Sequence, residues 1–225
     1  MRNFASEIPV FVSPMTRRHS STMPAHIDSK LVWTRPGYNL FLKVLSKFAT
    51  ISIWSSVKVA STRTIAHYLF RNVTPPRTVH SQEHCKRIVT FVVNRVPKYL
   101  KVEGTEKDVF LKTLSVGLFP MYRHVFTIEN TIVVDDSAYK HVLNNPNNVL
   151  LADTWSPKGE GASDSFLLDV LLPWLRQLHN SVKLGLHTFR LQNQLGHRLL
   201  CASDDSVEYI KLTRAIELFN ELVTR

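Results

Sequence analysis

The sequence predicts an α/β domain of three layers, with a mainly parallel central sheet between layers of helices. Apolar residues at helical spacing follow Pro36 and include Phe41 and Phe48. The next segment, residues 50–54, alternates in polarity and is rich in β-branched residues, which predicts a strand. The continuous apolar run 131–134 predicts a strand that is buried on both faces, as strands of parallel sheets are.

The remaining elements follow from the same two periodicities. A capping pattern of Thr105 and Asp108 opens a predicted helix that carries Lys112. The segment after residue 163 is predicted to be helical and bent at Pro173. The other predicted elements are a helix over 61–70, short strands over 89–93, 98–102 and 149–151, helical turns over 138–143, and an amphipathic helix from residue 204. We divide the chain into a poorly ordered segment (1–30), an α/β domain (31–180) and a helical extension (181–225).

Composition restricts the class of protein. The chain has 225 residues, of which 44% are hydrophobic, and this suits one globular domain with appendages. No apolar run approaches the ~18 residues of a membrane-spanning helix. The formal net charge of +10 favours acidic partners, but no aromatic residues interleave with a basic stripe, so specific nucleic-acid binding is not favoured.

Cysteine usage and the start of the chain bear on location. Cys85 and Cys201 are far apart in the sequence, which favours a reducing, intracellular compartment, nuclear or cytosolic. A mitochondrial location is the alternative, because the first 30 residues are poor in acidic residues, although prolines interrupt any long amphipathic helix there. Cys85 follows His80 and His84, but this spacing matches no standard set of zinc ligands.

Four short elements together point to phosphate chemistry: Arg35-Pro36-Gly37, then Ser55-Ser56 after a strand, then Lys112, then Asp135-Asp136 after another strand. Hydroxyls and a lysine can bind phosphoryl oxygens, and carboxylates supply the hard oxygen ligands that Mg²⁺ prefers. Each element alone has a structural explanation, such as a strand end, a solvated lysine or a helix cap. As an ordered set in an α/β pattern, they favour a phosphoryl site.

These elements also carry a resemblance to a known family. The sequence resembles the phosphatase domain that acts on the carboxy-terminal domain of RNA polymerase II, also called the NLI-interacting-factor-like domain, a branch of the haloacid dehalogenase superfamily. The resemblance runs from about residue 31 to about residue 178 and rests on WTRPGYNLFL, ISIWSSVK, FLKTLS and IVVDDSAYKHVLNNPNNVLL. It implies a haloacid-dehalogenase-like fold and a Mg²⁺-dependent protein serine/threonine phosphatase, with phosphoproteins as substrates or partners.

The resemblance also implies a role for each matching residue. Ser55, with Ser56 beside it, matches the hydroxyl residue that follows the second strand and binds phosphoryl oxygens. Lys112 matches the lysine that neutralises charge on the phosphate and on the nucleophile. Asp135 matches an acidic residue that helps to hold Mg²⁺, and Asp136 occupies the neighbouring position. The turn at Arg35 is expected to shape the first helix and not to react.

The first motif of that family is missing. It is a strand that ends in two aspartates one residue apart, of which the first attacks phosphorus and the second acts as acid and base. Before Pro36 the only carboxylates are Glu7 and Asp28, and no Asp-x-Asp occurs there. We therefore assign no catalytic residue and expect a domain without phosphatase activity and with weakened Mg²⁺ binding. The sheet would lack a central strand unless residues 8–13 fill that place.

Two other functions stay open from the sequence alone. One is a non-catalytic binding module related to the presequence receptor of the mitochondrial inner-membrane translocase. The other is an α/β interaction protein that docks a partner through its C-terminal helix. The sequence is compatible both with a pseudoenzyme and with a shortened reading frame.

Overall fold

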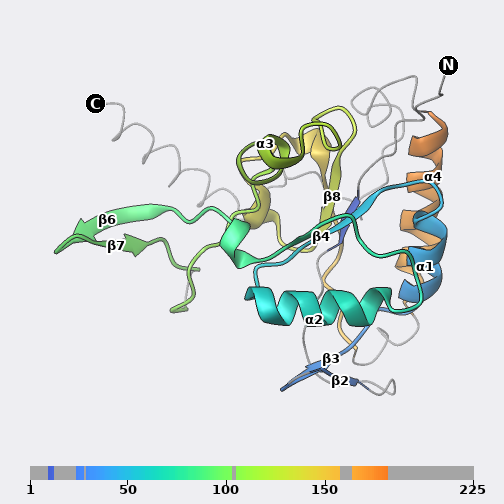
Figure 1. Ribbon diagram of the computed structural model, residues 1–225, viewed down its shortest axis with the longest axis horizontal. Helices are drawn as coiled ribbons and strands as arrows, with labels where there is room; N and C mark the ends of the chain where they lie inside the picture. The colour runs from blue at the N-terminus through green and yellow to red at the C-terminus, as the bar shows by residue number, and fades with distance from the viewer. Residues whose placement is uncertain (1–9, 13–23, 28, 103–104, 158–163, 182–225) are drawn as a thin grey trace.

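The computed structural model describes residues 10–12, 24–27, 29–102, 105–157 and 164–181 (Figure 1). The predicted amphipathic helix after residue 204 and the whole extension 181–225, except Ser181, lie outside these residues. The elements in chain order are β1 (Val10–Val12), β2 (Ala25–Ile27), β3 (Lys30–Val32), α1 (Tyr38–Leu45), β4 (Ile51–Trp54), α2 (Val59–Phe70), β5 (Val79–His80), η1 (Gln82–His84), β6 (Val89–Val93), β7 (Val96–Tyr99), η2 (Leu114–Leu118), α3 (Phe119–Tyr122), β8 (Ile132–Asp135), η3 (Ala138–His141), η4 (Pro146–Asn148), β9 (Val149–Leu151), η6 (Phe166–Leu171) and α4 (Leu172–Asn180).

A five-stranded sheet forms the centre of the domain, in the order β5-β4-β1-β8-β9, and every neighbouring pair is parallel. This confirms the predicted α/β fold class. Strands β4, β8 and β9 are buried along their whole length, as the apolar runs predicted. The sheet has no missing central strand, because β1, from the segment 8–13, pairs with β4 on one side and with β8 on the other.

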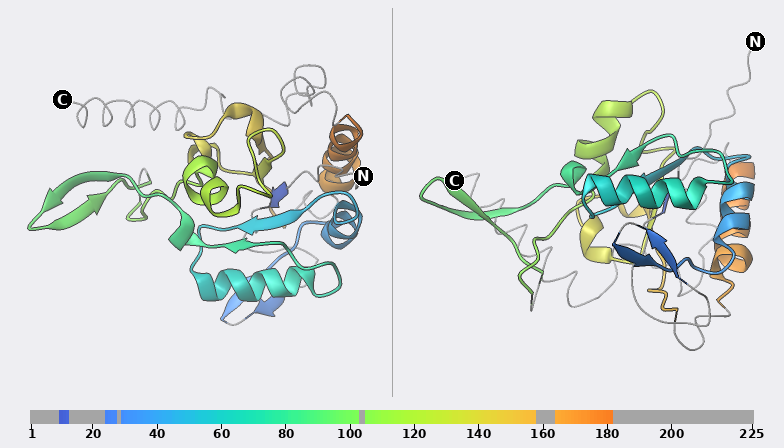
Figure 2. Two further views of the ribbon diagram at one scale, coloured as in Figure 1. Left: turned by 45° about the horizontal axis from the view of Figure 1, so that its top comes forward. Right: turned by 60° about the horizontal axis from the view of Figure 1, so that its bottom comes forward.

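Helical layers cover both faces of the sheet, which gives the predicted three layers (Figures 1 and 2). One face packs against α1, α2 and α4 in a continuous apolar cluster that includes Ile53 of β4 and Val134 of β8. The other face packs against η2 and the segment after α3 through Trp54 and Val133. These faces follow from the alternation of side chains along each strand.

The turn before α1 is structural, as the sequence analysis expected. Arg35 forms an ion pair with Asp164, with Nη2 2.6 Å from Oδ2, and its guanidinium lies 4.4 Å from the centre of the Phe166 ring. Gly37 has φ of 75°, and a Cβ at this position would come within 2.7 Å of the Leu168 side chain. Arg35 and Gly37 therefore attach the start of α1 to η6.

The predicted helix over Thr105 and Lys112 is wrong. Residues 108 and 111 instead pair in antiparallel bridges with Lys101 and Lys86. The Leu111 N–H donates to the carbonyl of Lys86, 2.8 Å away, so this segment is extended up to the start of η2. The capping pattern involves only neighbouring residues, whereas the extended form gains one short-range bridge with Lys101 and one long-range bridge with Lys86.

Two antiparallel hairpins lie outside the sheet. Strands β2 and β3 pack on α2, where Ile27 and Val32 contact Ile65. Strands β6 and β7 form a hairpin that projects from the body of the domain (Figure 1). None of the described helices is long and apolar enough to cross a membrane.

Candidate functional site

The parallel strands end at one edge of the sheet, and the predicted site residues gather there. Ser55 follows the last residue of β4, and Asp135 is the last residue of β8. Strand β1 lies between these two strands and ends at Val12. The carboxyl ends of the strands are where open α/β sheets bind their ligands.

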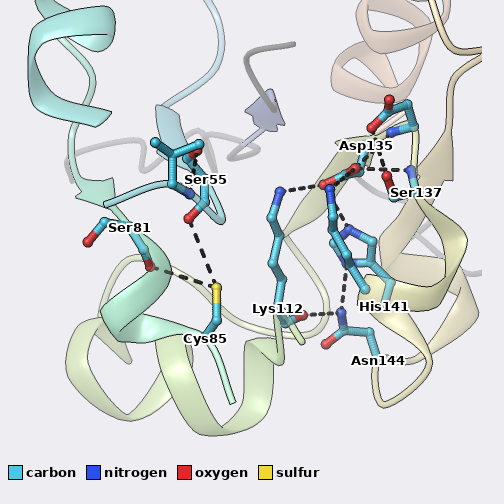
Figure 3. Close-up of polar contacts among 11 residues, drawn as sticks. Ser55, Ser81, Cys85, Lys112, Asp135, Ser137, His141 and Asn144 are labelled. Carbon is cyan, nitrogen blue, oxygen red and sulfur yellow. Dashed lines mark hydrogen bonds and ion pairs between the residues drawn. The ribbon is translucent and has the colours of Figure 1, made fainter. Parts of the chain in front are cut away.

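Lys112 reaches this edge from the extended segment before η2. Its side chain is 1% exposed and its ammonium forms an ion pair with Oδ2 of Asp135, which is fully buried (Figure 3). A lysine buried in this way is not a solvated surface residue. The structure therefore brings together two of the predicted site residues from segments 23 positions apart in the sequence.

Asp135 is held by backbone as well as side-chain donors. Its Oδ1 accepts hydrogen bonds from the backbone N–H groups of Asp136 and Ser137, at 2.8 and 3.0 Å. The Nζ atom of Lys140 lies 3.9 Å from the same oxygen. Burial alone would raise the pKa of Asp135, but the charge of Lys112 and the contact with His141 hold it well below the ordinary value. Asp135 is therefore an anion that orients Lys112.

Two further residues of the site, His141 and Asn144, lie in the run after Asp135 that carries the family resemblance, but the sequence analysis assigned them no role. The Nε2 atom of His141 lies 3.2 Å from Oδ2 of Asp135, and the ring is fully buried. The side-chain amide of Asn144 donates to the carbonyl of Lys112 at 2.6 Å, and its Nδ2 lies 3.1 Å from Nδ1 of His141. The Asn144 oxygen accepts from the N–H of Leu114, at 2.8 Å. Asn144 thus fixes the backbone on both sides of Thr113 and the ring of His141.

The two serines directly follow β4. Ser55 is 2% exposed, its N–H donates to the carbonyl of His80, and its hydroxyl accepts from the N–H of Val57, at 3.2 Å. Ser56 is half-buried and lines an open groove at the base of the projecting hairpin. Figure 3 shows Ser55 and Cys85 on the opposite side of the site from Asp135. The Cys85 thiol lies 4.0 Å from the Ser55 carbonyl, and burial raises its pKa.

Asp136 occupies a different environment from Asp135. Its Oδ1 accepts a hydrogen bond from the hydroxyl of Ser137, at 3.1 Å. Burial, followed by the neighbouring carboxylate of Asp135, raises the pKa of Asp136. Asp135 and Asp136 both border a mainly apolar cavity of about 110 Å³, which Lys112 does not line.

The family model of the NLI-interacting-factor-like phosphatases matches residues 10–184, which include all five strands of the central sheet, β1 among them. The chain belongs to this family. The match begins at β1 and includes Ser55, Lys112 and Asp135. The phosphatase-like domain of the haloacid dehalogenase type that the sequence analysis expected is thereby shown.

Solved structures similar to the chain include two of Fcp1. One is of Fcp1, an essential RNA polymerase II CTD phosphatase, with 15% identity, a TM-score of 0.38, and coverage of 85% of this chain and 47% of that one. The other is fission yeast Fcp1, an RNA polymerase II CTD phosphatase, in a variant bound to beryllium fluoride. It has 12% identity, a TM-score of 0.42, and coverage of 97% of this chain and 64% of that one. No curated protein matches the chain in a sequence comparison.

The NLI-interacting-factor-like phosphatases generally use Mg²⁺, and the residues of this chain fit such an ion poorly. Among the described residues, no group of three or more His, Cys, Asp or Glu side chains is arranged to hold a metal ion. Both oxygens of Asp135 already contact donors or cations of the protein. Asp136, the other carboxylate of the predicted pair, is half-buried and accepts a hydrogen bond from the Ser137 hydroxyl.

Proposed function

We propose that this phosphatase-like domain binds a phosphorylated protein segment at Lys112 and does not hydrolyse it. The main support is the sequence that follows β1, the central strand of the sheet. The family's nucleophile motif ends its central strand, and in this chain the sequence after Val12, the last residue of β1, reads Ser13-Pro14-Met15. Neither position of the Asp-x-Asp motif holds a carboxylate, and the next acidic residue in the sequence is Asp28.

Loss of the nucleophile motif should nearly abolish turnover and should affect phosphate binding much less. Removal of a covalent nucleophile lowers turnover by about 10⁶ in well-studied hydrolases. Phosphate monoesters hydrolyse extremely slowly without catalysis, so little residual activity is expected. Binding depends instead on Lys112 and on donors at the ends of β4 and β8, which the sequence keeps.

Charge favours this function over the presequence-receptor alternative. Mitochondrial presequences are rich in arginine and poor in acidic residues. The formal net charge of +10 favours an acidic, phosphorylated partner over a basic peptide. The receptor function, the compartment and the domain boundaries at residues 31 and 181 stay predictions.

The experiment measures both activity and binding with the full-length chain. We expect no hydrolysis of para-nitrophenyl phosphate with Mg²⁺, and binding of a phosphoserine peptide, but not of its unphosphorylated form, by calorimetry. Lys112→Met together with Asp135→Asn removes both charges of the buried pair and should weaken peptide binding by about tenfold or more. Lys47→Met, at an exposed lysine in the turn after α1, is the matched control and should bind as the unchanged protein does.

Two results would contradict the proposal. Turnover that Asp135→Asn abolishes would show that the domain is an active phosphatase; if Ser13→Ala also abolished it, Ser13 would be the nucleophile. Equal affinity for the phosphorylated and the unphosphorylated peptide would show that the domain does not recognise the phosphate group.

A further inference from the structure

We infer that the anion site at Lys112 binds phosphate without Mg²⁺. The inference rests on the proposed function and specifies how the same site works. It concerns the described residues Lys112, Asp135, Asp136, Lys140 and His141, which lie at or next to the carboxyl edge of the sheet.

The first argument is that Asp135 has little capacity left for a metal ion. A carboxylate offers about four acceptor sites. Oδ1 accepts from the backbone N–H groups of Asp136 and Ser137, while Oδ2 contacts the ammonium of Lys112 and lies 3.2 Å from Nε2 of His141. A metal ion would have to displace one of these groups, and the nearest cation, Lys112, would then repel it.

The second argument is that a single carboxylate ligand does not compensate for the water that Mg²⁺ must lose on binding. This ion demands near-octahedral oxygen coordination and gives up water reluctantly. Asp136 remains, but its Oδ1 already accepts a hydrogen bond from the Ser137 hydroxyl, at 3.1 Å. The first-motif carboxylate that would share the ion in active relatives has no counterpart between Val12 and Asp28.

The third argument is charge balance. In the family's arrangement, the two aspartates of the first motif contribute two negative charges, and one Mg²⁺ cancels them. This chain has neither aspartate, so the site without a metal ion carries the same net charge as the family's site with one. Lys112 and Lys140 already balance Asp135 and Asp136 in number. The side chain of Lys140 is 13% exposed, and its Nζ lies 3.9 Å from Oδ1 of Asp135.

The test measures binding of inorganic phosphate to the full-length chain by calorimetry, once with EDTA and once with MgCl₂ at matched ionic strength. Mg²⁺ alone is titrated in a separate experiment. We expect dissociation constants for phosphate that agree within about twofold in the two buffers. Asp136→Asn should strengthen phosphate binding in both buffers, because it removes a negative charge next to the anion site and a potential metal ligand together. The double variant Lys112→Met/Asp135→Asn should weaken binding about tenfold or more in both buffers.

The outcomes separate the two proposals. Phosphate binding that appears only with Mg²⁺, and that Asp136→Asn abolishes, would overturn the metal-independent site and leave phosphate recognition standing. No phosphate binding in either buffer, from a sample with an intact cooperative unfolding transition, would overturn both. Equal binding in both buffers, with no heat from Mg²⁺ alone, would support both.

Discussion

At the scale of single residues, the site depends on a buried ion pair that the sequence could predict only as two separate candidates. Lys112 and Asp135 were each predicted by the family resemblance, and the structure adds that they neutralise one another. His141 and Asn144 could not be predicted, because their roles come from contacts across the loop after β8 and not from any spacing in the sequence. A histidine in the run after Asp135 has no recognisable pattern until the 3₁₀ turn η3 directs it inwards.

The buried ion pair leads to a prediction that distinguishes the cost of an unpaired buried charge from the cost of changed packing. Lys112→Met alone leaves Asp135 buried without its main cation and should lower the free energy of unfolding by about 3–5 kcal/mol. Adding Asp135→Asn should recover part of that loss, because no unpaired charge is then buried. The measurement is urea unfolding of both single variants and of the double variant, analysed as a double-mutant cycle. If the single losses simply added, Lys112 and Asp135 would not be coupled and the buried pair would be refuted.

At the scale of elements, local patterns predicted local structure well and long-range pairing badly. Strands β4, β8 and β9 and helices α1 and α2 match the predicted ranges closely, because their burial patterns are visible in a few consecutive residues. The segment 105–112 was predicted as a helix and is extended, because Asp108 and Leu111 form bridges with Lys101 and Lys86, which lie 7 and 25 positions earlier in the chain. Segment 8–13 was recognised as a candidate strand, but only its pairing shows that it occupies the centre of the sheet.

The element η2, which follows Lys112, gives the second prediction. A Cβ at Gly117 would come within 2.8 Å of the Trp54 ring and 3.0 Å of the His84 carbonyl, so η2 can approach the sheet only with glycine there. Gly117→Ala should therefore lower the free energy of unfolding by about 1–3 kcal/mol through overpacking. Val116→Ala, at a residue of the same turn that is 61% exposed, should change it little. Denaturant unfolding of both variants tests the packing; equal stability of the two would contradict it.

At the scale of the whole molecule, the domain has the architecture of the phosphatase-like family, while the sequence after its central strand lacks the two aspartates of the first motif. The sheet, its helical layers and the ends of β4 and β8 are all in place, and β1 closes the sheet. The fold therefore does not require the nucleophile motif: its aspartates act at the edge of the sheet, whereas the strand is held by backbone pairing on both sides. The phosphate recognition that we propose would use the ends of β4 and β8 and would not depend on these aspartates.

Buried histidines make the stability of the whole domain depend on pH. His80 is buried at the end of β5, with its Nε2 2.9 Å from the hydroxyl of Thr78 and with the rings of Trp54, His84 and Tyr122 around it. Burial, together with the neighbouring His84, lowers the pKa of His80 from 6.5 to about 4. Burial also lowers the pKa of His141, so a second group acts in the same direction.

The unfolded chain binds a proton at residue 80 near pH 6.5, whereas burial keeps His80 of the folded chain neutral until the pH falls to about 4. The unfolded state therefore binds more protons across this window, and the free energy of unfolding should fall as the pH drops from about 6.5 towards 4. Each histidine that stays neutral contributes a slope of at most about 1.4 kcal/mol per pH unit. Urea unfolding at about pH 7 and about pH 5 measures the slope. His80→Gln should flatten it, because glutamine can bond Thr78 but does not titrate, whereas the exposed His67→Gln should not. A slope that His80→Gln leaves unchanged would show that His80 is accessible to protons in the folded domain.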